Sequence, residues 1–206
     1  MLDFYTYATV NGQAVAIALA ATRLPHQRHW VDLRHGEQRQ PDFLAINPSG
    51  RIPVIVDQAH EPPLVVHQTG AILAYLAQKA GQFGGQNERE AAQVQAWLWF
   101  QLTDVSINFF NNFYLKSLTQ PPQPAAANVL KQRAMGFYQE FDAQLQKQVY
   151  LVGEQMTIAD MAAYPVVHAM ADLLLDETKP HLSRWYAQMQ AKEAVQSGMQ
   201  AQAAGA

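Results

Sequence analysis

Strand-like segments are confined to the first 80 residues of this chain, and the glycine-rich stretch Gly81–Gly85 follows them. Before that stretch, short apolar and β-branched runs alternate with helical patterns, whereas after it the apolar residues recur at helical spacing only. A chain of 206 residues is long enough for one large or two small domains. We therefore expect two domains of different class: an α/β domain over residues 1–81 and an all-helical domain over residues 87–206.

The first 80 residues predict a small α/β unit. Thr9–Gly12 has turn chemistry, Pro25 ends the helix that follows it, and Asn47–Gly50 forms a second turn. Pro53 is placed at the start of a strand, where proline is tolerated. The expected strands cover residues 2–7, 29–33, 52–56 and 64–66, and the expected helices lie around residues 15–19, 43–46 and 69–80.

The remainder of the chain predicts helices only. Glu88–Leu118 is typical of one long helix, and the Pro/Ala-rich stretch Gln120–Ala127 separates it from a second helix over residues 128–149. Two or three further helices are expected after that. Thr157 and Asp160 have the spacing of a capping box, with Asp in place of the usual Glu, so we assign this pair to folding.

Composition excludes several classes of function. The 14 basic and 17 acidic residues give a net charge of −3, which provides no basic field for nucleic acid or an anionic membrane. The uncharged stretch Phe4–Thr22 is interrupted by Asn11–Gly12, so we expect no membrane span. Cysteine is absent, which excludes disulfides and thiolate nucleophiles and favours a reducing compartment. The seven histidines lack metal-ligand spacing, so we expect no metal.

Three segments carry side chains that suit ligand binding. Thr9 and Asn11 place a hydroxyl and an amide at the expected start of a helix, where free N–H groups favour an anion; helix capping is the alternative. Gln68 and Thr69 lie at a second helix start, with the same two interpretations. An Ile52–Pro53 bond in cis would leave the backbone of Ile52 free to pair with a peptide; an ordinary trans bond is the alternative.

Taken together, three motifs resemble the glutathione transferase superfamily over essentially the whole chain. They are Asn-Pro-Ser-Gly-Arg-Ile-Pro at 47–53, Gln-Thr-Gly-Ala-Ile-Leu at 68–73 and Thr-Ile-Ala-Asp at 157–160. Tyr-Ala-Thr-Val-Asn-Gly at 7–12 is most similar to the bacterial nu-class branch, whose members are glutathione-dependent disulfide-bond reductases. Val10 stands where that branch carries proline.

The resemblance implies a thioredoxin-like glutathione-binding domain followed by a helical-bundle domain. It implies that Ile52, before a cis Pro53, pairs with the cysteinyl backbone of glutathione. Gln68 and Thr69 are then expected to hold the γ-glutamyl end. The partners expected for the carboxylates are Arg51 and Gln38.

Because the chain has no thiol, the reactive thiol is expected to belong to glutathione. Thr9 and Asn11 are the expected donors to its sulfur. Tyr7 is the alternative, because it precedes Gly12 by the same five positions as the catalytic tyrosine of the animal tyrosine-type classes; its other interpretation is a core aromatic residue.

We expect an enzyme that transfers glutathione to a small electrophile or reduces disulfides. The alternative from another class is a non-catalytic ligand-binding or protein-interaction module of the same fold. The family resemblance also implies a homodimer, and we expect it in the cytoplasm.

Overall fold

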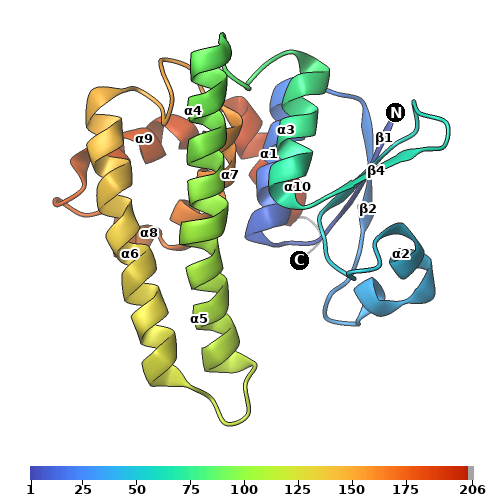
Figure 1. Ribbon diagram of the computed structural model, residues 1–206, viewed down its shortest axis with the longest axis horizontal. Coiled ribbons are helices and arrows are strands. Elements are labelled where there is room, and N and C mark those ends of the chain that lie inside the picture. The colour runs from blue at the N-terminus through green and yellow to red at the C-terminus, as the bar shows by residue number, and fades with distance from the viewer. Residues whose placement is uncertain (204–206) are drawn as a thin grey trace. The chain divides into compact units, whose positions relative to one another are not determined.

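The computed structural model describes residues 1–203, which form two compact units. One unit comprises Met1–Gly84 together with the described residues from Met189 on, and the other comprises Gly85–Gln188. The first holds a four-stranded sheet and the second is helical, as Figure 1 shows. Near residue 85 the structure changes from an α/β unit to helices. The return of the C-terminal segment to the first unit was not expected from the sequence.

The sheet has the strand order β2-β1-β3-β4. Its strands are β1 (Leu2–Thr6), β2 (His26–Trp30), β3 (Val54–Asp57) and β4 (Leu64–His67). β1 runs parallel to β2 and antiparallel to β3, and β4 runs antiparallel to β3. The prediction of a strand at residues 29–33 was wrong by three positions. β2 is an edge strand whose first residues are polar and exposed, so its start carries no apolar signal.

Helices cover both faces of the sheet (Figure 1). α1 (Val10–Thr22) and α3 (Thr69–Ala80) pack on one face, over the buried side chains of Leu2, Phe4 and Ile55. α2 (Pro41–Ile46) covers the other face, where Phe43 packs into a cluster with Val31, Val54 and Val56. A short 3-10 turn, η1 (Glu37–Arg39), precedes α2. α10 (Glu193–Ala203) packs against α1 in the same unit.

The second unit is built from helices around an aromatic core. Its elements are α4 (Glu88–Trp99), the π-helical η2 (Phe100–Ser106), α5 (Ile107–Ser117), α6 (Pro124–Lys147), α7 (Ile158–Ala169), α8 (Ala171–Leu174) and α9 (Pro180–Gln190). Trp97, Phe100, Tyr138 and Phe141 contact one another through their rings. No helix within residues 1–203 is both long enough and apolar enough to cross a membrane.

Three details of the helical part differ from the sequence prediction. The long helix expected over residues 88–118 has a π-helical segment in its middle. The second helix begins at Pro124 rather than residue 128, because proline is favoured in the first turn and three alanines follow it. Four helices, not two or three, follow it within the described part of the chain.

The capping box at the start of α7 is confirmed. Asp160 Oδ2 accepts the Thr157 backbone N–H at 2.8 Å and the Thr157 hydroxyl at 3.0 Å. Its other oxygen accepts the Leu151 N–H at 3.0 Å and the Trp185 indole N–H at 2.8 Å. The buried carboxylate is therefore satisfied by four donors, which is the condition for burying such a group. This pair serves the fold of the helical unit.

Candidate functional site

One end of the sheet carries every segment that the sequence predicts to bind or activate a ligand. Tyr5 on β1 lies opposite Val54 on β3, and Val54 lies opposite His67 on β4. Thr6 on β1 is in register with Trp30 on the parallel strand β2. We refer to this end, where those five residues lie, as the site end. The segments that adjoin the strands at this end are residues 7–12, 31–40, 47–53 and 68–70.

Thr9 is the N-cap of α1. Its backbone is extended, with φ −129° and ψ 157°, and its Oγ1 accepts the Gly12 backbone N–H at 3.1 Å. Capping, the alternative interpretation of this residue, is thus present. It leaves the hydroxyl proton free, since that proton has no acceptor among residues 1–203. A hydroxyl that already accepts a hydrogen bond is also a stronger donor.

Asn11 and Tyr7 flank Thr9 in different environments. Asn11 is the second residue of α1 and is exposed. Tyr7 is buried against Trp30, with ring centroids 5.1 Å apart, and the Arg34 guanidinium lies 5.7 Å from its ring. Its hydroxyl is buried and makes no close hydrogen bond among residues 1–203; the nearby Asp32 carboxylate is the acceptor that it faces. Burial, and then the neighbouring Asp32 carboxylate, raises the pKa of Tyr7, so the phenol stays protonated at neutral pH.

The turn before β3 is held by Asn47. Its side-chain Nδ2 donates to the Arg51 carbonyl at 2.7 Å, and its Oδ1 accepts the Ser49 backbone N–H at 3.2 Å. The Ile52–Pro53 peptide bond that follows is cis, as the resemblance implies. The backbone N–H and C=O of Ile52 have no hydrogen-bond partner among residues 1–203. This half-buried residue therefore offers one donor and one acceptor to an extended peptide.

Gly50 brings the same turn against η1. A Cβ at Gly50, which has φ +59°, would lie only 2.8 Å from the Gln38 carbonyl oxygen. The structure therefore places Gln38 beside the segment that carries Arg51. The Gln38 Oε1 is buried without a partner among the described residues, while the Arg51 side chain is exposed. Arg51 is therefore open to solvent at this end, and Gln38 Oε1 lies beneath the surface without a partner.

α3 begins with uncapped N–H groups. Gln68 precedes it with φ 72°, a left-handed conformation that is uncommon for a residue other than glycine, and its side chain is exposed and makes no cap. The backbone N–H groups of Thr69 and Gly70 have no partner among residues 1–203. Free N–H groups at a helix start attract a carboxylate. Helix capping was the alternative interpretation of Gln68 and Thr69; Gln68 makes no side-chain cap bond, and Thr69 is the first residue of the helix.

Sequence reasoning missed one cluster, at the opposite end of the sheet. Asp57 is fully buried, accepts the Ala59 backbone N–H at 2.9 Å and lies 2.6 Å from Lys79 Nζ. Tyr75 donates its hydroxyl to the same carboxylate. No local motif marks this cluster, because Asp57 and Lys79 are 22 positions apart and meet only when α3 packs on β3. We refer to it as the Asp57 end.

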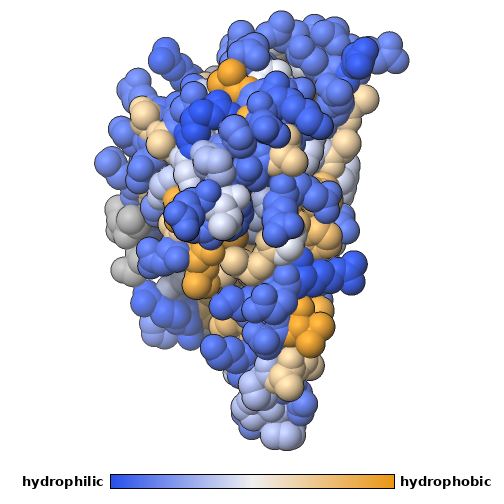
Figure 2. Space-filling view, turned by 90° about the vertical axis from the view of Figure 1, so that its left-hand side faces the viewer, coloured by the Kyte–Doolittle hydropathy of each residue, from blue (hydrophilic) through white to orange (hydrophobic). Residues whose placement is uncertain are grey.

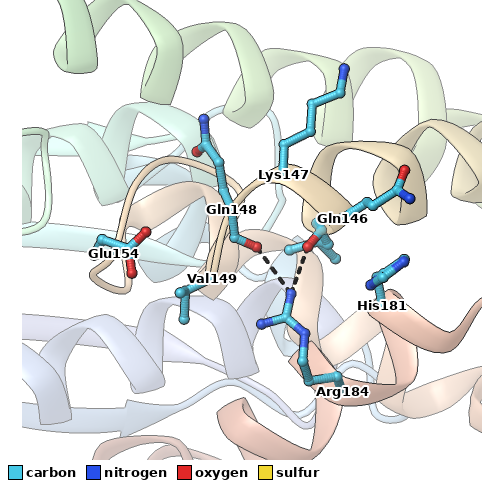
Figure 3. Close-up of a pocket in the computed structure, with 8 residues that line it drawn as sticks. Gln146, Lys147, Gln148, Val149, Glu154, His181 and Arg184 are labelled. Carbon is cyan, nitrogen blue, oxygen red and sulfur yellow. Dashed lines mark hydrogen bonds between the residues drawn. The ribbon is translucent and has the colours of Figure 1, made fainter.

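The pocket in Figure 3 belongs to the helical unit and contains none of the candidate residues. Its lining includes Arg184, which donates from Nη2 to the Leu145 carbonyl at 2.6 Å and to the Gln148 carbonyl at 3.0 Å. The guanidinium thus satisfies free carbonyls at the end of α6, a structural role. Within residues 1–203, no three His, Asp or Glu side chains gather as a metal site.

Comparisons with known proteins cover most of the chain. Models of the families described as "Glutathione S-transferase, N-terminal domain" and "Glutathione S-transferase, C-terminal domain" match residues 11–79 and 102–193. The chain is 31% identical over 200 residues to the disulfide-bond oxidoreductase YfcG of Escherichia coli K12, covering 94% of this chain and 92% of that protein.

Two solved structures show how far the similarity extends in three dimensions. A glutathione transferase homolog from Lodderomyces elongisporus, with two GSH per subunit, has a TM-score of 0.88 at 27% identity, covering 97% of this chain and 98% of that one. A glutathione transferase from Pseudomonas putida, with one glutathione disulfide bound per subunit, has a TM-score of 0.86 at 26% identity, covering 96% and 90%.

Proposed function

The chain belongs to the glutathione S-transferase family, and from this we propose that it is an enzyme that binds glutathione and ionises its thiol for attack on an electrophile or a disulfide. The observation that carries the proposal is the register of the sheet. It brings an unpaired peptide backbone, an open helix start and a threonine with a free hydroxyl proton to one end.

The tripeptide fits the unpaired groups of the site end. In the proposed complex, the Ile52 backbone pairs with the cysteinyl residue, and the N–H groups of Thr69 and Gly70 bind the γ-glutamyl carboxylate with Gln68. Arg51 and Gln38 are then placed for the remaining polar groups. Each of these protein groups lacks a partner among the described residues or is exposed, so binding replaces no internal hydrogen bond.

The chemistry requires a lowered thiol pKa. A free thiol has a pKa of about 8.5, and lowering it by about two units takes about 2.7 kcal/mol of differential stabilisation. A hydrogen bond to a charged group contributes about 1.5–3 kcal/mol, and a helix N-terminus contributes about 0.3–1 kcal/mol more. The Thr9 hydroxyl at the start of α1, assisted by the Asn11 amide, therefore suffices without a general base.

Two reactions follow from the same thiolate. With an electrophile that carries a leaving group, the sulfur forms a new bond to carbon and gives a thioether. The leaving group departs with the electron pair of the carbon bond that breaks. With a disulfide, it attacks one sulfur, forms a mixed disulfide and releases the other sulfur as a thiolate that takes a proton from water. A second glutathione thiolate then resolves the mixed disulfide and yields glutathione disulfide. We favour disulfide reduction, because one relative is named a disulfide-bond oxidoreductase and one similar structure holds glutathione disulfide.

Two measurements test this proposal. The first is retention on immobilised glutathione with elution by free glutathione; a chain that passes through unretained contradicts it. The second compares turnover of a model aryl halide with turnover of a mixed disulfide of glutathione. We expect the disulfide to be the better substrate. Retention without turnover of either compound would instead establish the non-catalytic module.

We further propose a homodimer that works in the cytoplasm. Exposed large apolar side chains gather on α4 and α5 and the residues around them, where a second copy would cover them; they are Trp99, Ile107, Phe110, Phe113, Tyr114 and Leu118. Figure 2 shows orange, hydrophobic atoms among the blue ones on the lower part of the face it presents. The cytoplasm is the compartment in which glutathione keeps thiols reduced. Light scattering on the purified protein tests the dimer; a monomer mass contradicts it.

A further inference from the structure

α10 packs closely on α1, although the two helices lie near opposite ends of the sequence (Figure 1). A Cβ at Gly198 would lie 2.6 Å from the backbone of Ile17, so only glycine allows this approach. Arg28 on β2 donates its guanidinium to the Ala201 carbonyl. These contacts fix the end of α10 against α1 and β2.

The last turn of α10 carries a buried amide that reaches the site end. Gln202 is fully buried, and its Oε1 lies 3.3 Å from the Thr6 hydroxyl, which is also fully buried. The same hydroxyl lies 3.4 Å from the Tyr7 carbonyl oxygen. That carbonyl accepts the Thr9 backbone N–H at 2.7 Å. A short chain of polar contacts therefore connects α10 to the residue that caps α1.

Gly12 shows how tightly these groups pack under the first turn of α1. A Cβ there would lie 2.4 Å from the Tyr7 carbonyl, 2.5 Å from the Thr6 hydroxyl and 3.2 Å from Gln202 Oε1. Gly12 is also the residue whose N–H binds Thr9 Oγ1. The turn that orients the Thr9 hydroxyl thus rests directly on these three polar groups.

We propose that Gln202 is a positioning residue: through Thr6 and the Tyr7 carbonyl, it fixes the backbone of Thr9 and hence the direction of the Thr9 hydroxyl. The role rests on the proposed function, in which that hydroxyl donates to the thiolate. Gln202 is fully buried and does not touch the ligand. It acts on Thr9 through Thr6, from which it is separated by 196 positions in the sequence.

Packing alone does not account for a glutamine at this position. Gln202 Nε2 is buried without a partner among residues 1–203, and burying an unpaired amide nitrogen costs free energy that an apolar side chain of similar size would not. What an apolar side chain cannot do is hold the Thr6 hydroxyl. Rotating the side-chain amide by 180° exchanges Oε1 and Nε2 and keeps the contact with Thr6. Nε2 then donates to the Thr6 hydroxyl oxygen, and the Thr6 hydroxyl donates its proton to the Tyr7 carbonyl.

The decisive experiment compares Gln202→Ala with Gln200→Ala, an identical change on the exposed side of the same helix. Thr6→Val removes the hydroxyl at constant shape, and Thr6→Ser restores it. For each full-length variant, kcat, KM for glutathione, the pKa of the bound thiol and hydrogen exchange at the Thr9 amide are measured. The temperature of unfolding is followed in parallel.

We expect Gln202→Ala and Thr6→Val to raise the bound thiol pKa and to lower kcat by about tenfold, less than the hundredfold that a 1 Å misplacement costs. KM should stay within about twofold, because other loops bind the tripeptide. Thr9 amide exchange should accelerate. Gln200→Ala should match the parent protein, and Thr6→Ser should recover most of what Thr6→Val loses.

An unchanged thiol pKa and kcat in Gln202→Ala would overturn the proposal, as would a loss of kcat that disappears when the fraction of unfolded protein is taken into account. If the parent protein itself leaves the thiol pKa unchanged, the proposed function fails. Thr9 amide exchange then decides the structural link separately: faster exchange in Gln202→Ala than in Gln200→Ala supports it, and equal exchange overturns it.

Discussion

At the Asp57 end of the sheet, both oxygens of a buried carboxylate are satisfied by the fold itself, through Ala59, Tyr75 and Lys79. At the site end, the Ile52 backbone and the N–H groups of Thr69 and Gly70 have no partner among the described residues. The same four strands build both ends. The difference shows which polar groups maintain the fold and which are left for a ligand.

The largest effect is expected from Asp57→Asn. Asn removes the buried charge that Lys79 and Tyr75 bind, and loss of a hydrogen bond to a charged group costs about 1.5–3 kcal/mol of unfolding free energy, while kcat per folded molecule should not change. Urea denaturation and activity at matched folded fractions measure both. Asp172→Asn, at an exposed carboxyl of the helical unit, is the control and should be near neutral. A loss of kcat in folded Asp57→Asn would contradict the separation of the two ends.

Low pH should remove the stabilisation that the Asp57 carboxylate provides. Burial by itself would raise the pKa of Asp57, but hydrogen bonds from Lys79, Tyr75 and the Ala59 N–H hold it well below its ordinary value. A carboxyl with a lowered folded pKa stabilises the fold above its unfolded pKa of about 3.9 and loses that effect as the pH falls.

The difference in unfolding free energy between the parent and Asp57→Asn should therefore be constant near neutrality and shrink below about pH 4. Denaturation curves at a series of pH values measure it. A difference that persists undiminished in acid would show that the carboxylate charge is not the stabilising element.

Thr9→Ala tests the site end. Loss of a hydrogen bond to a charged sulfur should lower kcat by about a hundredfold, which corresponds to about 2.7 kcal/mol. Loss of the cap should also cost about 1 kcal/mol of stability. Thr9→Ser keeps both the cap and the donor, and should retain most of the activity. Equal kcat values for the alanine and serine variants would remove Thr9 from the mechanism.

Gln68→Ala should have a smaller effect, confined to binding. One hydrogen bond of about 1 kcal/mol corresponds to a rise in KM for glutathione of about fivefold, with kcat unchanged. Gln78→Ala, on the exposed side of α3, is the matched control. If both variants have the parental KM, Gln68 does not hold the tripeptide.

Tyr7→Phe should change least. The hydroxyl makes no close hydrogen bond among residues 1–203, so its removal costs at most a weak interaction with Asp32, and we expect kcat within about threefold of the parent and nearly unchanged stability. Steady-state kinetics and thermal unfolding measure both. Abolished turnover would assign the thiol donor to Tyr7 and not to Thr9.

How much of this was predictable differs between local and long-range features. β1, α3 and the capping box at Thr157 follow from short-range patterns, because apolar periodicity and cap chemistry act within a few residues. The edge strand β2 was placed three residues late because edges need no apolar residues. The start of α6 was missed because Pro124 suits both a break and a first helical turn.

The candidate site divides in the same way. The loops at residues 7–12, 47–53 and 68–70 were predicted, since turn residues and helix starts mark them in the sequence. Their convergence follows from the sheet register. The contact of Gln202 with Thr6 was not predictable, because 196 positions separate the two and it depends on α10 docking through Gly198. Periodicity carries no information on such a contact.

The decisive test of thiol activation by Thr9 is the pKa of the glutathione thiol in its complex with the parent protein and with Thr9→Ala, read from the ultraviolet absorbance of the thiolate. We expect a value about two units below that of free glutathione for the parent and a return most of the way to the free value for Thr9→Ala. An identical lowered value in both proteins, or a value equal to that of the free tripeptide in the parent, would contradict it.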